Sequence, residues 1–243
     1  MPDASPSPPR RRWGLALAAL PVLAVLLGLG TWQVRRLHWK TELLAHIAAA
    51  EAGPTQPLSA SPEPFAKVAA TGRFDHGREA LLGVELRGTT LGARLLTPLL
   101  REGAPPLLVD RGWVPLERDR PIGHPEGEVT VTGYVRPADS RDWNSPKDDP
   151  AGRRFYLFDP AAIGQALDLP PPAPFGLVAL AAPGATPATL PVAASALPRP
   201  TNPHLGYAVT WYGLAAALAG VVLAALWRRP EPAPPLPAGE DGP

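Results

Sequence analysis

Two long apolar segments, one toward each end of the chain, constrain this sequence more than any other feature. Residues 13–34 carry no charged side chain and would form a helix about 33 Å long at 1.5 Å of rise per residue. Residues 207–227 form a second uncharged run, followed directly by Arg228 and Arg229. The hydrocarbon core of a bilayer is about 30 Å thick, so each run is long enough to cross it. We therefore expect an integral membrane protein with transmembrane helices at residues 13–34 and 207–227.

The first segment could instead be a cleaved signal peptide, because three arginines at positions 10–12 precede it. Its apolar stretch is longer than that of a signal peptide. It also ends in the sequence WQVRR, which lacks the small residues of a cleavage site. Retention as a membrane span is the favoured interpretation.

The loop between the two spans is long, and long loops are exported largely regardless of their charge. We expect residues 35–206 to lie outside the cytoplasm and the tails, residues 1–12 and 228–243, to lie inside it. Both tails are short and rich in proline, and residues 1–12 and 230–243 are expected to be disordered.

The region between the spans begins with a helix-forming segment, residues 41–52, into which the first span could continue. Short strand-like segments punctuated by glycine and proline follow. This pattern predicts a β-rich (α+β) domain built on an antiparallel sheet or small barrel. We expect one short helix at residues 160–167 and irregular structure at residues 137–154 and 183–203. The predicted strands are residues 65–74, 79–86, 93–100, 106–110, 113–115, 129–136, 155–158 and 175–181.

Composition excludes several classes of function. The chain has no cysteine, so it has no disulfide, thiolate metal site or cysteine nucleophile. With Met1 as the single methionine, soft ligands for Cu(I) are missing, which disfavours a copper chaperone. A net charge of +1 gives no indication of nucleic-acid binding.

The sequence contains no signature of a hydrolase elbow, phosphate-binding loop, dinucleotide site or His-Glu-x-x-His metal pair. We therefore do not expect an enzyme. The carboxylates of the loop are expected to be solvated surface groups: Asp110, Glu117, Asp119, Asp142, Asp148 and Asp149.

Polar and aromatic residues gather at the exported ends of both spans. At helical spacing, Trp32, either Arg35 or Arg36, and Trp39 share one face of the first helix. His204, Tyr207 and Trp211 line one stripe of the second. Aromatic and basic belts anchor many membrane proteins, so anchoring is the simpler interpretation. A histidine at this boundary is less routine, because neutral imidazole is a good iron ligand and guanidinium groups pair with carboxylates.

At these residues the chain resembles the Surfeit locus protein 1 family of cytochrome c oxidase assembly factors. The resemblance follows the order of the motifs along nearly the whole chain. The motifs are GTWQVRRLHWK at 30–40, TPL at 97–99, LVDRGWVP at 108–115, Gly133 with Arg136, Phe155-Tyr156 with Asp159, and NPHLGYAVTW at 202–211. The family more usually has Asn where this chain has Asp110.

The resemblance implies a membrane-bound factor that binds haem a and assists its insertion into the catalytic subunit of cytochrome c oxidase. It makes that subunit the expected partner, and the haem a synthesis enzymes could be partners too. It places the chain in a bacterial inner membrane, with residues 35–206 in the periplasm. The alternative is a scaffold that stabilises an oxidase assembly intermediate without binding cofactor.

The same resemblance makes His204 the expected haem iron ligand. As a hypothesis, Arg35 or Arg36 would hold the propionates, Trp32 and Trp211 would flank the ring, and Tyr207 would lie in the same stripe. The isoprenoid tail would lie between the spans, where small residues such as Gly28 and Gly213 would let the helices approach closely.

The motif Arg111-Gly112-Trp113 has two open interpretations. A local structural role is favoured, with glycine in a bend, tryptophan in the core and arginine in a local ion pair. Contact with the oxidase subunit is the alternative. His38 lies at the same interface as His204, but we expect no role for it or for the other remaining histidines, His46, His76 and His124.

Overall fold

The computed structural model describes residues 10–117, 120–182 and 189–227. The chain divides into two compact units, with boundaries after Leu43 and after Pro200. The long helices are α1 (Arg10–Ala52) and α3 (His204–Trp227). One unit contains α3 and the part of α1 up to Leu43, and the other unit is β-rich. Two apolar terminal helices enclosing a β-rich domain confirm the predicted fold class. The predicted disordered tails lie almost wholly outside the described residues, as does the segment 183–188 of the predicted irregular region.

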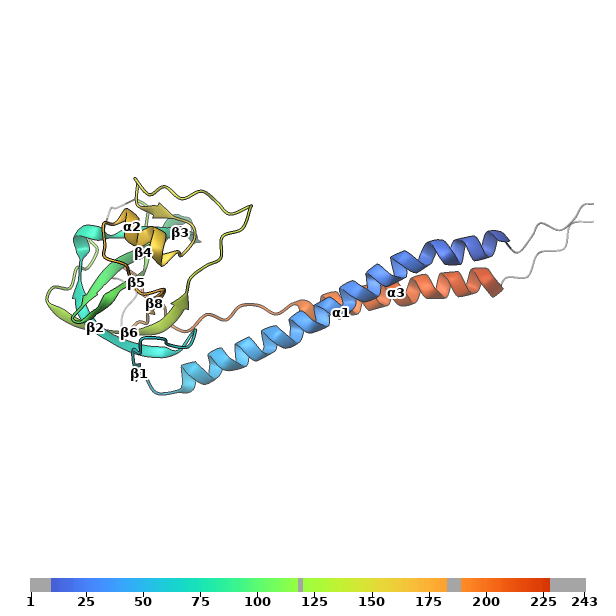
Figure 1. The fold of residues 1–243 in the computed structure, drawn as a ribbon, viewed down its shortest axis with the longest axis horizontal. Helices are drawn as coiled ribbons and strands as arrows, with labels where there is room; N and C mark the ends of the chain where they lie inside the picture. Colours follow the sequence, from blue (N-terminus) through green and yellow to red (C-terminus); the bar gives the residue numbers. More distant parts are fainter. Residues whose placement is uncertain (1–9, 118–119, 183–188, 228–243) are drawn as a thin grey trace, which may run out of the picture. The chain divides into compact units, whose positions relative to one another are not determined.

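Helices α1 and α3 lie side by side and run antiparallel (Figure 1). Alanine and leucine dominate both, and each helix is long and apolar enough to cross a membrane. Helix α1 continues without a break through the predicted helical segment 41–52 and ends where Gly53 N donates to the carbonyl of Ala49. Its 43 residues correspond to about 65 Å, roughly twice a bilayer core, so its polar part extends beyond the apolar segment.

Five strands of the second unit close into a small barrel. The sheet order β2-β6-β8-β5-β4 returns to β2 through a second pairing between β2 and β4, in which Arg73 and Phe74 face Leu100 and Leu99. Strands β1, β3 and β7 extend the sheet outside this ring. The elements are β1 (Gln56–Pro57), β2 (Lys67–Phe74), a 3-10 helix (His76–Arg78), β3 (Ala80–Arg87), β4 (Thr90–Arg101), β5 (Ala104–Pro115), β6 (Glu128–Pro137), β7 (Arg154–Phe155), α2 (Pro160–Ala166) and β8 (Phe175–Ala179).

The barrel is filled by aliphatic side chains that alternate along its strands. Leu99, Leu107, Val109 and Leu177 belong to this central cluster and are at most 1 % exposed. A second cluster on the outer side of β4 and β5 packs against α2 through Ile163 and neighbouring residues. The predicted helix at 160–167 is therefore present, and it begins where Asp159 accepts hydrogen bonds from Ala161 N and Ala162 N.

Strand β5 is continuous where the sequence analysis expected two strands. Its pairing with β4 shifts by one residue, because Leu95 faces Gly112 while the next residue, Leu96, faces Asp110. Arg111 is thus the extra residue of a β-bulge, a feature that re-aims side chains without ending a strand. Gly112 adopts φ +133°, and a side chain there would collide with the carbonyl of Val192.

The expectation that Asp110 is a solvated carboxylate is wrong. Asp110 is 2 % exposed, and Arg94 Nε donates to both of its oxygens at 3.0 and 2.9 Å. Its Oδ1 also accepts from Gly112 N at 3.0 Å, which holds the bulge in shape. A charge-assisted pair satisfies this buried carboxylate in place of water.

The geometry of the bulge predicts that a methyl group added at Gly112 destabilises the fold. Gly112→Ala places a Cβ against the backbone of Val192 at a φ that L-residues avoid, so we expect it to lower the free energy of unfolding by about 2–4 kcal/mol. Gly103 is the matched control, because it also has positive φ (+66°) but lies at an open turn, and Gly103→Ala should cost about 1–2 kcal/mol. Thermal unfolding of the full chain in detergent measures both. Equal losses would contradict the close contact assigned to Gly112.

Candidate functional site at the helix ends and the barrel

A hydrogen bond between the two long helices fixes His204 at the start of α3. Its Nδ1 lies 2.7 Å from Oε1 of Gln33, which is only 8 % exposed. An amide oxygen only accepts, so Nδ1 carries the proton and Nε2 keeps its lone pair when the ring is neutral. That is the arrangement in which a histidine is prepared to bind a metal through its second nitrogen. Sequence reasoning did not single out Gln33, although an amide among apolar helix residues needs such a partner.

The segment that enters α3 is tied to α1 by a second polar group. Asn202 Nδ2 donates to Thr41 Oγ1 at 3.2 Å and to the carbonyl of Leu37 at 3.4 Å. Its Oδ1 is buried without a hydrogen-bond partner among the residues that the structure describes. The entrance to α3 is thus held by two side-chain amides, that of Gln33 in α1 and that of Asn202 in the segment before α3.

The side chains of Arg35 and Arg36 leave helix α1 in directions that differ from each other and from that of Gln33. A helix advances about 100° per residue, so Arg35 lies about 200° from Gln33 and faces away from α3. Arg36 lies about 60° from the direction of Gln33, on the flank that also carries Trp32. The Arg36 guanidinium lies 4.4 Å from the centre of the Trp39 ring, and both side chains are exposed.

Of the residues in the predicted stripe on α3, some face α1 and others are exposed. Trp211 follows His204 by two turns on the face toward α1 and is half-buried. Tyr207 lies about 60° off that face and is 55 % exposed. In an antiparallel pair this is the same flank as Trp32 and Arg36, so these three side chains lie beside His204 on one flank of the helix pair.

The small residues at the helix contact differ from those singled out in the sequence. A Cβ added at Gly28 or Gly213 meets no atom of the described residues within 4 Å, so neither provides the close approach. Gly30 does, because its added Cβ would come within 2.9 Å of the Tyr212 ring. The Tyr212 hydroxyl shares a 3.1 Å hydrogen bond with Thr31 Oγ1 at the same place.

This contact predicts that Gly30→Val separates the helices while Gly28→Val does not. The valine at position 30 overlaps Tyr212, and overpacking of this kind costs about 1–3 kcal/mol. Amide hydrogen exchange of α3 residues 204–212 in detergent should therefore be at least about fivefold faster in Gly30→Val. Unchanged exchange in that variant would contradict the packing of Gly30 against Tyr212.

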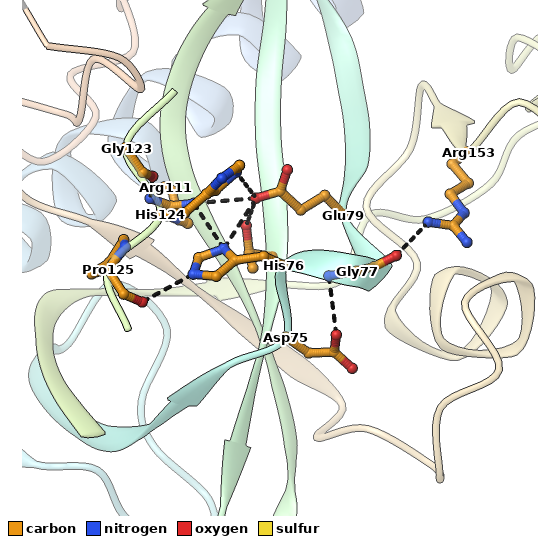
Figure 2. Close-up of polar contacts among 10 residues, drawn as sticks. Asp75, His76, Gly77, Glu79, Arg111, Gly123, His124, Pro125 and Arg153 are labelled. Carbon is orange, nitrogen blue, oxygen red and sulfur yellow. Dashed lines mark hydrogen bonds and ion pairs between the residues drawn. The ribbon is translucent and has the colours of Figure 1, made fainter. Parts of the chain in front are cut away.

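The β-rich unit holds a second polar cluster, centred on Glu79 (Figure 2). Arg111 Nη1 donates to Glu79 Oε1 at 3.2 Å, and Thr97 Oγ1 donates to the same oxygen at 3.0 Å. His76 Nδ1 and His124 Nε2 each lie 3.5 Å from it. The bulge of β5, the connection from β2 to β3 and the loop after β5 all meet here.

The motif Arg111-Gly112-Trp113 has the local roles that the favoured interpretation gave it. Arg111 is 8 % exposed and lies over the Phe74 ring at 5.0 Å. Burial lowers the pKa of the Arg111 guanidinium, and the charge and hydrogen bond of Glu79 oppose that shift. Trp113 is 5 % exposed and its Nε1 donates to the Glu85 carbonyl at 3.1 Å.

Two histidines to which the sequence analysis gave no role therefore belong to a cluster. The cluster could not be predicted from the sequence because His76 and His124 are far apart in the chain. The His-x-x-Glu spacing of His76 and Glu79 was the only part of it with a local signal. The other two lie elsewhere: His46 Nε2 is 3.2 Å from the Pro64 carbonyl, and His38 is exposed on α1.

Comparison with known proteins identifies the family. The family model described as SURF1 family matches residues 20–216. Surfeit locus protein 1 of Xenopus tropicalis is 30 % identical over 231 residues, covering 85 % of this chain and 72 % of that protein. The human protein of the same name is 30 % identical, covering 85 % and 74 %, and that of Takifugu rubripes is 31 % identical, covering 85 % and 92 %. The resemblance inferred from the ordered motifs is confirmed, and this chain is a membrane protein that belongs to the SURF1 family.

Proposed function

We propose that this protein is an assembly factor for cytochrome c oxidase that binds haem a and assists its insertion into the catalytic subunit. The observation that carries the proposal is the hydrogen bond from His204 Nδ1 to Gln33. It orients the imidazole and leaves Nε2 as the atom that would bind iron. The residues present therefore fit a haem ligand.

The surroundings of His204 suit the rest of such a ligand. Bound haem would supply an iron that an imidazole can ligate and propionates that can accept hydrogen bonds from guanidinium groups. Arg36 is the arginine that would hold a propionate, because it lies on the flank of Trp32 and Tyr207 whereas Arg35 faces away. Trp211 and Trp32 would border the ring on the two helices.

A transfer role follows from the number of ligands that the chain would contribute. A single imidazole holds iron less firmly than two, so ligands of the oxidase subunit could replace it. The chain's own part is to bind, orient and release the cofactor without catalysing a reaction. We place it in a bacterial inner membrane, with both termini cytoplasmic and residues 35–206 periplasmic. The oxidase catalytic subunit would be its partner, joined by haem a synthesis enzymes during loading.

The proposal predicts the absorption spectrum of the protein purified from membranes that make haem a. The wild type should carry haem a, and His204→Ala should lose nearly all of it. Gln33→Leu should retain clearly less than the wild type, because loss of an outer hydrogen bond to a metal ligand typically weakens binding about 10–100-fold. Gln33→Glu, which keeps an acceptor for Nδ1, should retain the pigment.

His38→Ala is the matched control, since His38 is an exposed histidine of α1 near the same boundary. It should load like the wild type. Equal loading of His204→Ala and the wild type would remove His204 as the ligand.

A scaffold that binds the oxidase subunit without cofactor is the second candidate. One observation favours a protein contact: Val84 and Leu86 of β3 and Leu91 of β4 are 55, 64 and 48 % exposed, and Leu86 pairs with Leu91 across the hairpin. A scaffold would co-purify with the oxidase subunit and carry no haem under any loading condition.

A further inference from the structure

We propose that His76, Glu79 and His124 form a binding site for a divalent transition-metal ion of the Zn²⁺ class in the β-rich unit. The site is independent of the haem proposal, because it uses none of the residues at the helix ends. Figure 2 shows the two imidazoles and the carboxylate converging beside Arg111. Their ligand atoms all lie within 4.8 Å of one another.

The spacing of these atoms is that of metal ligands. His76 Nδ1 and His124 Nε2 are each 3.5 Å from Glu79 Oε1, which is longer than a good hydrogen bond. Two ligands that bind one tetrahedral Zn²⁺ at their usual bond lengths are about 3.4 Å apart. The third edge, between the two imidazole nitrogens, is within 4.8 Å and would have to shorten to complete the ligand triangle.

The groups behind the ligands hold them in the required state. His76 Nε2 lies 3.0 Å from the carbonyl of Pro125, which can only accept, so Nε2 carries the proton and Nδ1 presents its lone pair to the cluster. Thr97 Oγ1 donates to Glu79 Oε1 and orients the carboxylate. Metal-binding histidines and carboxylates are typically supported in this way by outer hydrogen bonds.

Arg111 is the competing charge. Its Nη1 lies 3.2 Å from Glu79 Oε1 and 3.5 Å from His76 Nδ1, so in this structure the guanidinium supplies the positive charge that the carboxylate needs. Binding requires Nη1 to withdraw from the ligands. Arg111 can remain anchored during that movement, because Nη2 also donates to the carbonyl of Gly123 and the guanidinium lies over Phe74.

The donor set selects the class of ion. Two imidazoles and one carboxylate suit Zn²⁺ and neighbouring divalent ions, and the described residues offer no thiolate for softer ions. The ion would join the connection between β2 and β3 to the loop after β5, and its fourth position would be open to water or another ligand. Binding should therefore make the loop around His124 more rigid.

Zn²⁺ titration of the full chain in detergent tests the site. The protein is purified with a tag that contains no histidine, stripped with a chelator and titrated with Zn²⁺ by calorimetry. We expect one equivalent that depends on His76, Glu79 and His124. His124→Ala and Glu79→Gln should each weaken it by at least about 10–100-fold, the loss that removal of even an outer ligand contact produces.

His124 is the safest position for the main variant, because its side chain is 47 % exposed and its removal leaves the core intact. His46→Ala is the matched control, since His46 lies in the same unit but contacts the Pro64 carbonyl, and it should bind like the wild type. Hydrogen exchange in the segment 122–125 should also slow on Zn²⁺ addition in the wild type but not in His124→Ala. No saturable binding, or equal binding by the wild type and His124→Ala, would overturn the proposal.

Discussion

The closure of the barrel on β2 is the constraint on which the β-rich unit depends. β2 pairs with β6 along nearly all of its length, from Lys67 to Arg73, but with β4 only through Arg73 and Phe74. This short second pairing turns an open sheet into a ring, which buries the aliphatic core and pairs the adjoining ends of β2 and β4. It also delivers the end of β2 to β4, so that Asp75 N can donate to the Pro98 carbonyl and His76 follows beside Glu79.

The bulge in β5 serves the same corner of the barrel. Arg111 is the extra residue of the bulge, so it interrupts the regular two-residue alternation of the strand. Asp110 pairs with Arg94, and Arg111 pairs with Glu79. Two buried charges are thereby satisfied within two consecutive residues.

The sequence predicted the elements better than the contacts between them. Uncharged length identified both long helices, and punctuation by glycine and proline identified the strands of the barrel, because both signals are local. Arg111-Gly112 was interpreted as a break between strands, since a bulge and a turn use the same residues. Gln33 and His124 were missed because their meaning comes from partners far away in the chain, His204 and Glu79, that only the folded structure brings near. The ordered motifs predicted His204, whereas nothing local distinguished Arg36 from Arg35 until the direction of Gln33 was known.

In the two proposals made above, His204 and His76 would be prepared by the same chemistry for different ligands. In each, one ring nitrogen lies against an oxygen that can only accept, which reserves the other for a metal. His204 faces a neutral amide, which would suit the proposed haem iron, since a porphyrin brings its own negative charge. His76 faces the carboxylate of Glu79, which suits a bare divalent ion that must find its negative charge in the protein. The acceptor prepares the imidazole, and the charge beside it decides which ligand it can hold.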